Sequence, residues 1–347
     1  MKILYAIQGT GNGHLARARE IVPILQNYAE TDLLVSGYHS ELTLPWEIKY
    51  KLGGLGFTFG KNGGIDYKST FSSNSLRRFF KEVKQLPVKD YDLVLSDFEP
   101  VSAWACRLRG QRCIGLSHQA AVLHPAAPRP AVKDPLGRFL LRHYAPTSSS
   151  FGFHFQKFAP GVSTPVIRSD IRSGKAGDKG HYTVYLPAYA DLSIISFLSN
   201  FRNIRWEVFS KNARRPYSFQ DIRIRPIEKE AFTESLLQCS GVLCNAGFET
   251  PAEALFLGKK LCVVPMKHQY EQQCNAALLQ QMGVDTVPDL HEKHRGQIES
   301  WLQGPAPVRQ LYPDNTQRFI ERILEESSSY HIEYFPMAGG FLMPNRG

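Results

Sequence analysis

The stretch over residues 239–282 limits the fold of this chain more than any other, because it alternates short apolar runs with helical patterns. Two buried strands and two helices are predicted there, in chain order at 241–244, 250–257, 261–264 and 271–282. A turn signal at 245–247 stops the first strand, and Gly258 and Gly283 end the helices. Strands that are joined through helices run parallel, so the sequence predicts a parallel α/β sheet.

Polar groups gather where the first of these strands ends, which is the edge at which parallel sheets bind ligands. Asn245 stands there, and Gly247 allows the backbone to approach a ligand closely. Thr250 is predicted as the N-cap of the following helix, whose unpaired N–H groups suit phosphate. Glu253 has two interpretations of equal weight: its carboxylate accepts hydroxyl hydrogen bonds, as from a ribose, or it closes a capping box with Thr250.

The second helix carries two adjacent amides, Gln272 and Gln273. An amide has both hydrogen-bond donors and acceptors, which suits sugar hydroxyls. Such a pair is, on its own, more often part of a solvated helix face.

The whole pattern, A-G-x-x-T-x-x-E followed by a strand and H-x-x-x-Q-Q-x-N-A, resembles the donor half of the GT-B glycosyltransferases. It is most similar to the UDP-sugar family of the peptidoglycan lipid II-forming N-acetylglucosaminyltransferase and the plant galactolipid synthases. The resemblance implies that Glu253 holds the donor ribose, that Thr250 lies beside the diphosphate, and that Gln272 and Gln273 read the sugar. The other members of this implied donor site are Asn245, Gly247 and His268.

At the other end of the chain, a strand over Lys2–Ile7 leads into the turn Q-G-T-G-N-G-H and a helix. The spacing of Gly11 and Gly13 is that of neither a dinucleotide-binding turn nor a Walker P-loop. His14 follows in the first turn of the helix, and its imidazole is a candidate general base, or it simply packs or caps. Arg17, one turn further, faces a phosphate, a carboxylate or solvent.

A His in this turn is also the proposed base of the resembling glycosyltransferase family, whose G-x-G-G-H layout differs by one residue from the one here. The resemblance therefore implies that His14 takes a proton and that Gly11, Gly13 and Arg17 lie on the acceptor side. The run G-N-G-H-L-A-R over residues 11–17 also resembles the nucleotide-sugar hydrolase of pseudaminic acid synthesis, in which such a His positions water.

Two further predicted strands end in polar residues. One runs into Asp97 and Glu99, and the next runs into His118 and Gln119. Because parallel strands end at one edge of a sheet, these side chains are expected to form one site with His14. Asp97 and Glu99 are candidate catalytic residues that orient His14 or bind the acceptor, and His118 and Gln119 are placed on the acceptor side.

A chain of 347 residues suits two domains. We expect an acceptor-side domain, a Pro- and Gly-rich linker, a donor domain, and a last helix with a tail that returns toward the first domain, over 1–160, 161–180, 181–314 and 315–347. In the linker, T-P-V-I-R resembles that of the family, which implies that Arg168 approaches the diphosphate. Ile227 falls where the family contacts the nucleobase.

The net charge of +9 admits nucleic acid, an anionic membrane surface or a phosphate-bearing substrate as partners. The sequence contains no nucleic-acid-binding motif, so no nucleic-acid partner is expected. The basic run Leu76–Lys84 is predicted to be a helix in which Phe79 and Phe80 either touch a membrane surface or lie in the core. The Gly-rich stretch 52–67 is predicted to be a loop over the acceptor.

No apolar run reaches the ~18 residues of a membrane span, and the N-terminus reads as a strand rather than as a signal peptide. The six scattered cysteines are expected to be reduced, which predicts a cytoplasmic protein, with the inner face of a membrane as a candidate location. No cofactor and no bound metal are expected.

These observations predict a GT-B fold, in which two Rossmann-like α/β domains face each other across a cleft. The resemblance implies inverting transfer of a sugar from a nucleotide sugar, expected to be UDP-linked, to an unidentified acceptor, for which a lipid or a cell-envelope glycan is a candidate. The alternatives are a nucleotide-sugar hydrolase, an epimerase of the same fold that would use Asp97 and Glu99, and a binding protein without catalysis.

Overall fold

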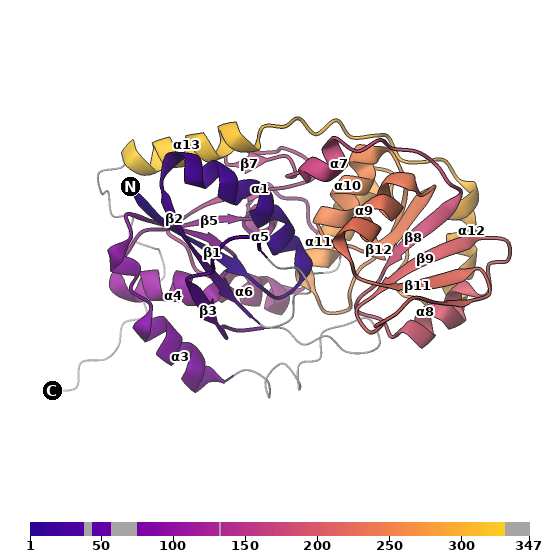
Figure 1. The fold of residues 1–347 in the computed structure, drawn as a ribbon, viewed down its shortest axis with the longest axis horizontal. Coiled ribbons are helices and arrows are strands. Elements are labelled where there is room, and N and C mark those ends of the chain that lie inside the picture. The colour runs from indigo at the N-terminus through magenta and orange to yellow at the C-terminus, as the bar shows by residue number, and fades with distance from the viewer. Residues whose placement is uncertain (38–43, 57–74, 132, 330–347) are drawn as a thin grey trace.

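The computed structural model describes residues 1–37, 44–56, 75–131 and 133–329. Within them the chain forms two sheets side by side, as the sequence predicts (Figure 1). Most of the predicted acceptor loop over 52–67, and the tail from residue 330, lie outside the described residues.

The first sheet is entirely parallel and has the strand order β3-β2-β1-β4-β5-β6-β7. Its strands are β1 (Lys2–Gln8), β2 (Glu30–Ser36), β3 (Tyr50–Leu52), β4 (Leu93–Asp97), β5 (Cys113–Ser117), β6 (Ser149–Phe153) and β7 (Val162–Ser163). Its helices are α1 (Asn12–Tyr28), α3 (Leu76–Gln85), α4 (Pro100–Arg109), α5 (His118–Leu123) and α6 (Pro135–Tyr144). The short strand β7 lies inside the segment predicted as a linker.

The second sheet has the order β10-β11-β9-β8-β12-β13-β14 and is parallel except for the edge strand β10. Its strands are β8 (His181–Tyr185), β9 (Arg205–Ser210), β10 (Tyr217–Phe219), β11 (Ile222–Pro226), β12 (Gly241–Asn245), β13 (Lys260–Val264) and β14 (Asp285–Thr286). The helices from the linker onward are α7 (Ser169–Arg172), α8 (Asp191–Leu198), α9 (Lys229–Gln238), α10 (Glu249–Leu257), α11 (Tyr270–Gln281), α12 (Arg295–Gln303) and α13 (Thr316–Ser329).

Both sheets reverse their strand order at a central pair, β1–β4 in the first and β8–β12 in the second. Open α/β sheets bind ligands in the crevice beyond such a pair, at the carboxyl ends of the strands. The β1–α1 turn and the end of β4 therefore share one crevice, and the loop after β12 shares the other. These loops are the ones that carry the predicted site residues.

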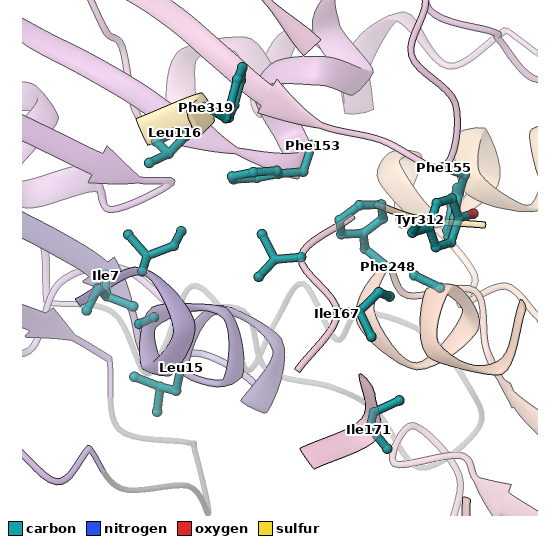
Figure 2. Close-up of a cluster of buried hydrophobic side chains, with 14 of the residues drawn as sticks. Ile7, Leu15, Leu116, Phe153, Phe155, Ile167, Ile171, Phe248, Tyr312 and Phe319 are labelled. Atoms are coloured by element: carbon teal, nitrogen blue, oxygen red, sulfur yellow. The ribbon is translucent and has the colours of Figure 1, made fainter. Parts of the chain in front are cut away.

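One apolar cluster runs from the first sheet into the second domain (Figure 2). Ile7 and Phe153 enter it from the first sheet, Ile167 and Ile171 from the linker, and Phe248 from the loop before α10. The ring of Phe248 is 4% exposed and packs edge-on against Phe155, with ring centroids 5.0 Å apart. The facing edges of the domains are thus packed together as a core.

The last helix lies beside the first domain. After α12, the chain crosses back and α13 lies along α1 (Figure 1). The Tyr28 hydroxyl at the end of α1 donates a hydrogen bond to Glu321 of α13.

The two phenylalanines of the basic helix α3 lie in different environments. Phe79 is 4% exposed and packs into the core, whereas Phe80 is 52% exposed. The membrane interpretation of this helix therefore applies to Phe80 and not to Phe79. Among the helices in the described segments, none combines the length and apolarity needed to cross a bilayer.

Candidate functional site

The predicted base lies against a buried carboxylate. His14 Nδ1 is 2.8 Å from Asp97 Oδ1, which brings the β1–α1 turn and the end of β4 together. Arg17 Nη2 also lies 3.0 Å from His14 Nδ1, but the carboxylate is the stronger acceptor and fixes the proton on Nδ1. A neutral imidazole in that tautomer has its lone pair on Nε2, the arrangement that a general base requires.

Asp97 is fully buried and receives hydrogen bonds from several directions. Arg17 donates to it from Nε at 3.1 Å and from Nη2 at 2.6 and 2.9 Å, and Tyr5 lies 3.5 Å away. Burial alone would raise the pKa of Asp97, but Arg17 and His14 hold it below the ordinary value. The carboxylate therefore stays ionised and can stabilise an imidazolium on His14.

The predicted role of Glu99 beside His14 is wrong. Its side chain is the N-cap of α4 and accepts hydrogen bonds from the Val101 and Ser102 backbone N–H groups at 2.8 and 2.6 Å. Ser36 Oγ donates a third bond at 2.6 Å. Because Glu99 is fully buried among these donors, it holds the start of α4.

Gly11 and Gly13 shape the start of α1. Gly11 is the N-cap with φ 98°, a conformation that glycine adopts most readily. A Cβ at Gly13 would lie 2.4 Å from Glu249 Oε2, so the missing side chain leaves room for a carboxylate of the second domain. Arg17 Nη1 donates a hydrogen bond to the same carboxylate. Arg17 was predicted to face a phosphate, a carboxylate or solvent, and in the structure it binds the carboxylates of Asp97 and Glu249.

A pocket of about 210 Å³ lies between the start of α1 and the second domain. Most of the predicted donor residues line it: Arg168, Ile227, Asn245, Gly247, Thr250, Glu253 and Gln272. Among the residues that the structure describes, His268 and Gln273 do not line this pocket. Asn12, Gly13, Ala16 and Arg19 form the wall on the side of the first domain, and Glu249 lines the pocket from the second domain.

The helix after β12 starts earlier than predicted. α10 begins at Glu249 after Phe248, whose buried ring anchors the preceding loop, so Thr250 is in the first turn and is not the N-cap. Glu253 therefore closes no capping box. It accepts hydrogen bonds from Arg168 Nε at 2.6 Å and Nη2 at 2.8 Å. The helix N-terminus still points at the pocket, with Gly247 bordering open space.

Arg168 thus pairs with Glu253, the residue predicted to hold the ribose, and its approach to the diphosphate stays a prediction. Its guanidinium also donates to Thr233 Oγ1 of α9 at 3.0 Å. Burial raises the pKa of Glu253, and the Arg168 charge opposes that shift. A bidentate guanidinium occupies one lone pair on each carboxylate oxygen and leaves the others for hydroxyl donors.

The two glutamines of α11 hold the loop that precedes their helix. Gln272 Oε1 accepts from the Met266 N–H at 2.9 Å, and Gln273 Nε2 donates to the Met266 carbonyl at 3.1 Å. Asn245 Nδ2 donates to the Val264 carbonyl at 2.8 Å, and its Oδ1 is buried without a hydrogen-bond partner among the described residues. Gln272 and Asn245 remain within reach of a ligand in the pocket, because both line it.

His118 and Gln119 contact side chains of the second domain. His118 lies with Nε2 2.7 Å from Asn275 Oδ1 and Nδ1 2.8 Å from the Phe153 carbonyl. Its ring stacks on Phe248 with centroids 3.9 Å apart. Gln119 Nε2 donates to Glu271 at 2.9 Å. Both side chains thus have partners at the boundary between the domains, and their acceptor-side role stays a prediction.

Sequence reasoning missed the partners on the second domain, namely Phe248, Glu249, Glu271 and Asn275. Only Asn275 was part of the quoted N-A pattern, and its contact with His118 could not be read from spacing. The described residues contain no group of three or more His, Cys, Asp or Glu side chains arranged to hold a metal ion.

Comparison with known proteins assigns the chain to a family. Residues 1–304 match a family described as "Glycosyl transferase family 1". A search among curated proteins found no match.

Solved structures match over nearly the whole chain at low identity. Arabidopsis thaliana UGT89C1 complexed with UDP has a TM-score of 0.53 and 16% identity over 95% of this chain and 91% of that one. Phytolacca americana UGT2 complexed with UDP-2fluoro-glucose and pterostilbene has a TM-score of 0.55 and 13% identity over 95% and 99%. Acinetobacter baumannii MurG has a TM-score of 0.52 and 14% identity over 93% and 99%.

The predicted fold is confirmed by these structures, which share the two facing α/β domains. The predicted transferase class is confirmed by the family match, which covers most of the chain. The chain therefore belongs to glycosyl transferase family 1 and has the GT-B fold.

Proposed function

We propose that this protein is an inverting glycosyltransferase that uses a UDP-linked sugar and needs no metal. The observation that carries the proposal is the pairing of a His14–Asp97 dyad in one domain with an adjacent pocket lined by Gly247, Thr250 and Glu253 of the other. Two proteins of the same fold were solved with UDP or a UDP-sugar, so UDP is the first nucleotide to test. We also propose that the domains join within 161–180.

In the proposed donor complex, Glu253 accepts the ribose hydroxyls while Arg168 holds its carboxylate in place. The nucleobase lies against Ile227. The diphosphate lies at the N-terminus of α10, where unpaired N–H groups and the helix dipole favour negative charge. Gln272 recognises the sugar from the pocket wall. Gln273 and His268 support Gln272 from positions outside the pocket lining.

The proposed reaction is a single displacement. His14 Nε2 takes the proton of the acceptor hydroxyl, whose oxygen attacks the anomeric carbon as the bond to the diphosphate breaks. Asp97 stabilises the imidazolium that results, since it accepts the Nδ1–H. Negative charge moves to the diphosphate, which the helix N-terminus stabilises in the product. One displacement inverts the anomeric configuration.

The donor site is tested by calorimetry with UDP, GDP, dTDP and CMP. UDP is expected to bind the wild type, and Glu253→Ala is expected to weaken it by at least about tenfold, since it loses hydrogen bonds to a charged group. Glu234→Ala removes an exposed carboxylate of α9 and serves as the matched control. Unchanged UDP affinity in Glu253→Ala would remove the ribose assignment.

Inversion is tested without knowing the acceptor, because water can take its place. UDP-α-glucose and UDP-α-N-acetylglucosamine are followed by proton NMR during slow hydrolysis. The β-anomer is expected to appear first, and the α-anomer as first product would contradict a single displacement. Release of free sugar that stays fast in the presence of cell-envelope acceptors would favour the hydrolase alternative.

We do not favour the epimerase alternative, which was predicted from Asp97 and Glu99. It needs carboxylates beside the sugar, but Asp97 is enclosed by His14 and Arg17, and Glu99 caps α4. Neither lines the pocket.

We further propose peripheral contact with an anionic membrane through α6 and α3. On α6, Leu136, Phe139 and Leu140 are 64%, 57% and 44% exposed beside Arg138 and Arg142. Apolar side chains next to cations suit an anionic lipid surface.

Vesicle sedimentation tests this contact. Binding to phosphatidylglycerol vesicles, and not to phosphatidylcholine vesicles, is expected, and Phe139→Ser should weaken it. Phe219→Ser changes an equally exposed ring on β10 of the second domain and is the control. Equal binding of the two variants would refute the assigned surface.

A further inference from the structure

Arg17 connects the two domains through the proposed catalytic centre. Its side chain is buried, and its guanidinium makes three hydrogen bonds to Asp97 at the end of β4. The remaining Nη1 donates to Glu249, the first residue of α10. One cation therefore joins the carboxylate that orients His14 to the helix whose N-terminus faces the pocket.

The start of α1 is built to receive Glu249. The residue at position 13 lies so close to Glu249 Oε2 that any side chain there would collide with it at 2.4 Å. The glutamate also stands at the N-terminal end of α1, where a negative charge is favoured. The guanidinium of Arg17 thus binds this carboxylate, and the missing Cβ at Gly13 leaves room for it.

The charges explain why this contact matters. Glu249 borders the pocket and its side chain is 22% exposed. An unpaired carboxylate there would repel a diphosphate at the same helix end, but pairing with Arg17 compensates its charge. Among the residues that the structure describes, the other hydrogen-bond partners of Arg17 are Asp97 and His14, both in the first domain.

We propose that Arg17 and Glu249 form an interdomain coupling that sets the orientation of His14 only while the second domain is docked on α1. Both are positioning residues: Glu249 acts on Arg17, Arg17 acts on Asp97, and Asp97 holds the imidazole. The coupling is a property of the two domains, and its catalytic consequence rests on the proposed function.

The first measurement follows His14 directly. Proton–carbon and proton–nitrogen NMR spectra of histidine-labelled full-length protein, assigned with His14→Gln, report its tautomer. The wild type is expected to show the Nδ1–H tautomer. Glu249→Ala is expected to give a mixed or exchange-broadened signal. Glu249→Gln keeps an acceptor for Arg17, so its signal is expected to lie between those of the wild type and Glu249→Ala. An unchanged His14 signal in Glu249→Ala would overturn the coupling.

The matched control is Glu321→Gln. It also removes a carboxylate that contacts α1, by way of Tyr28, but it does so at the exposed far end of that helix. Its His14 signal should equal that of the wild type. A change of equal size in Glu321→Gln and Glu249→Ala would mean that the effect is general loosening of α1 and would overturn the specific link.

The second measurement separates positioning from donor binding. Hydrolysis of UDP-glucose is expected to lose about 10- to 100-fold in kcat in Glu249→Ala, because the base is misaligned. UDP is expected to bind no more weakly than to the wild type, because the variant removes a carboxylate that borders the proposed diphosphate site. Loss of UDP affinity with unchanged kcat would contradict the assignment. Gly13→Ala, which pushes Glu249 away and leaves its charge intact, should reproduce the loss in kcat.

The two proposals fail in different ways. If the wild type binds no UDP, the proposed function is wrong, and the His14 spectrum still decides on the coupling. If UDP binds and UDP-glucose is turned over, but the His14 signal is unchanged in Glu249→Ala, the proposed function stands and the coupling is wrong.

Discussion

His14 Nδ1 lies 2.8 Å from Asp97 Oδ1, although 83 positions separate these residues in the chain. The contact follows from the sheet, because β1 and β4 are neighbours and Ile7 is paired with Asp97. The helix after β1 then carries His14 back over the end of β4. Each of the following predictions depends on a contact of this kind, made between distant parts of the sequence.

Replacing His14 with Ala should abolish transfer and leave the donor site intact. A general base contributes about 10²- to 10⁴-fold to a rate, so donor turnover is expected to fall by that factor. UDP affinity, measured by calorimetry, should remain within about twofold, since His14 does not line the pocket. Turnover close to that of the wild type would exclude His14 as the base.

Asp97→Asn should lower stability as well as activity, unlike His14→Ala. The amide leaves the buried Arg17 without its main counter-charge, and breaking such a pair costs on the order of 3 kcal/mol. Urea unfolding followed by circular dichroism measures the change. Asp92→Asn alters an exposed carboxylate just before the same strand and should cost less than about 1 kcal/mol. Equal losses in both variants would contradict the argument.

Stability should fall as the pH drops below about 6.5, because two histidines are buried in neutral form. Burial lowers the pKa of His118 to about 4 and that of His154 to about 3. The unfolded chain takes up these protons first, so each histidine can cost up to about 1.4 kcal/mol per pH unit between its unfolded and folded pKa values.

Urea unfolding of the wild type and of His154→Phe between about pH 6.5 and 4.5 checks this. The variant is expected to lose less stability over that range, whereas His143→Phe, at an exposed position of α6, should follow the wild type. Parallel curves for the wild type and His154→Phe would show that the buried histidine does not contribute.

Phe248→Ala should weaken the docking of the two domains. The ring stacks on His118 with centroids 3.9 Å apart and fills the apolar cluster between the sheets (Figure 2). Truncation of a buried Phe costs about 3–5 kcal/mol, measured by thermal or urea unfolding. Phe219→Ala, in which the ring is 48% exposed, should be nearly neutral. A loss below about 1 kcal/mol in Phe248→Ala would mean that the domains are held elsewhere.

Local patterns predicted the elements well, because periodicity and turn residues act within a few positions. The strands β12 (Gly241–Asn245) and β13 (Lys260–Val264) are within one residue of the predicted bounds 241–244 and 261–264. The start of α10 was missed because the burial of Phe248 against His118 set it, and a Thr-x-x-Glu spacing contains no information on that contact.

Residue type was a weaker guide to role than to location. Asp97 and Glu99 both follow β4, yet one holds His14 and the other caps α4. Likewise Gln272 and Gln273 are adjacent, yet only Gln272 lines the pocket. Neighbouring side chains on a helix, or after the end of a strand, point in different directions. Spacing therefore places such residues at one edge of the sheet but does not predict which group each side chain contacts.

The sequence by itself determined the two parallel sheets, the loops that bear the polar residues and the family resemblance, because hydrophobic periodicity and turn chemistry are local. Only the tertiary structure decided which groups became partners. Arg17 meets Asp97 and Glu249, 80 and 232 positions away, and Arg168 meets Glu253. A charge that folding removes from water needs an opposite charge beside it, and which one it finds depends on how the two domains pack.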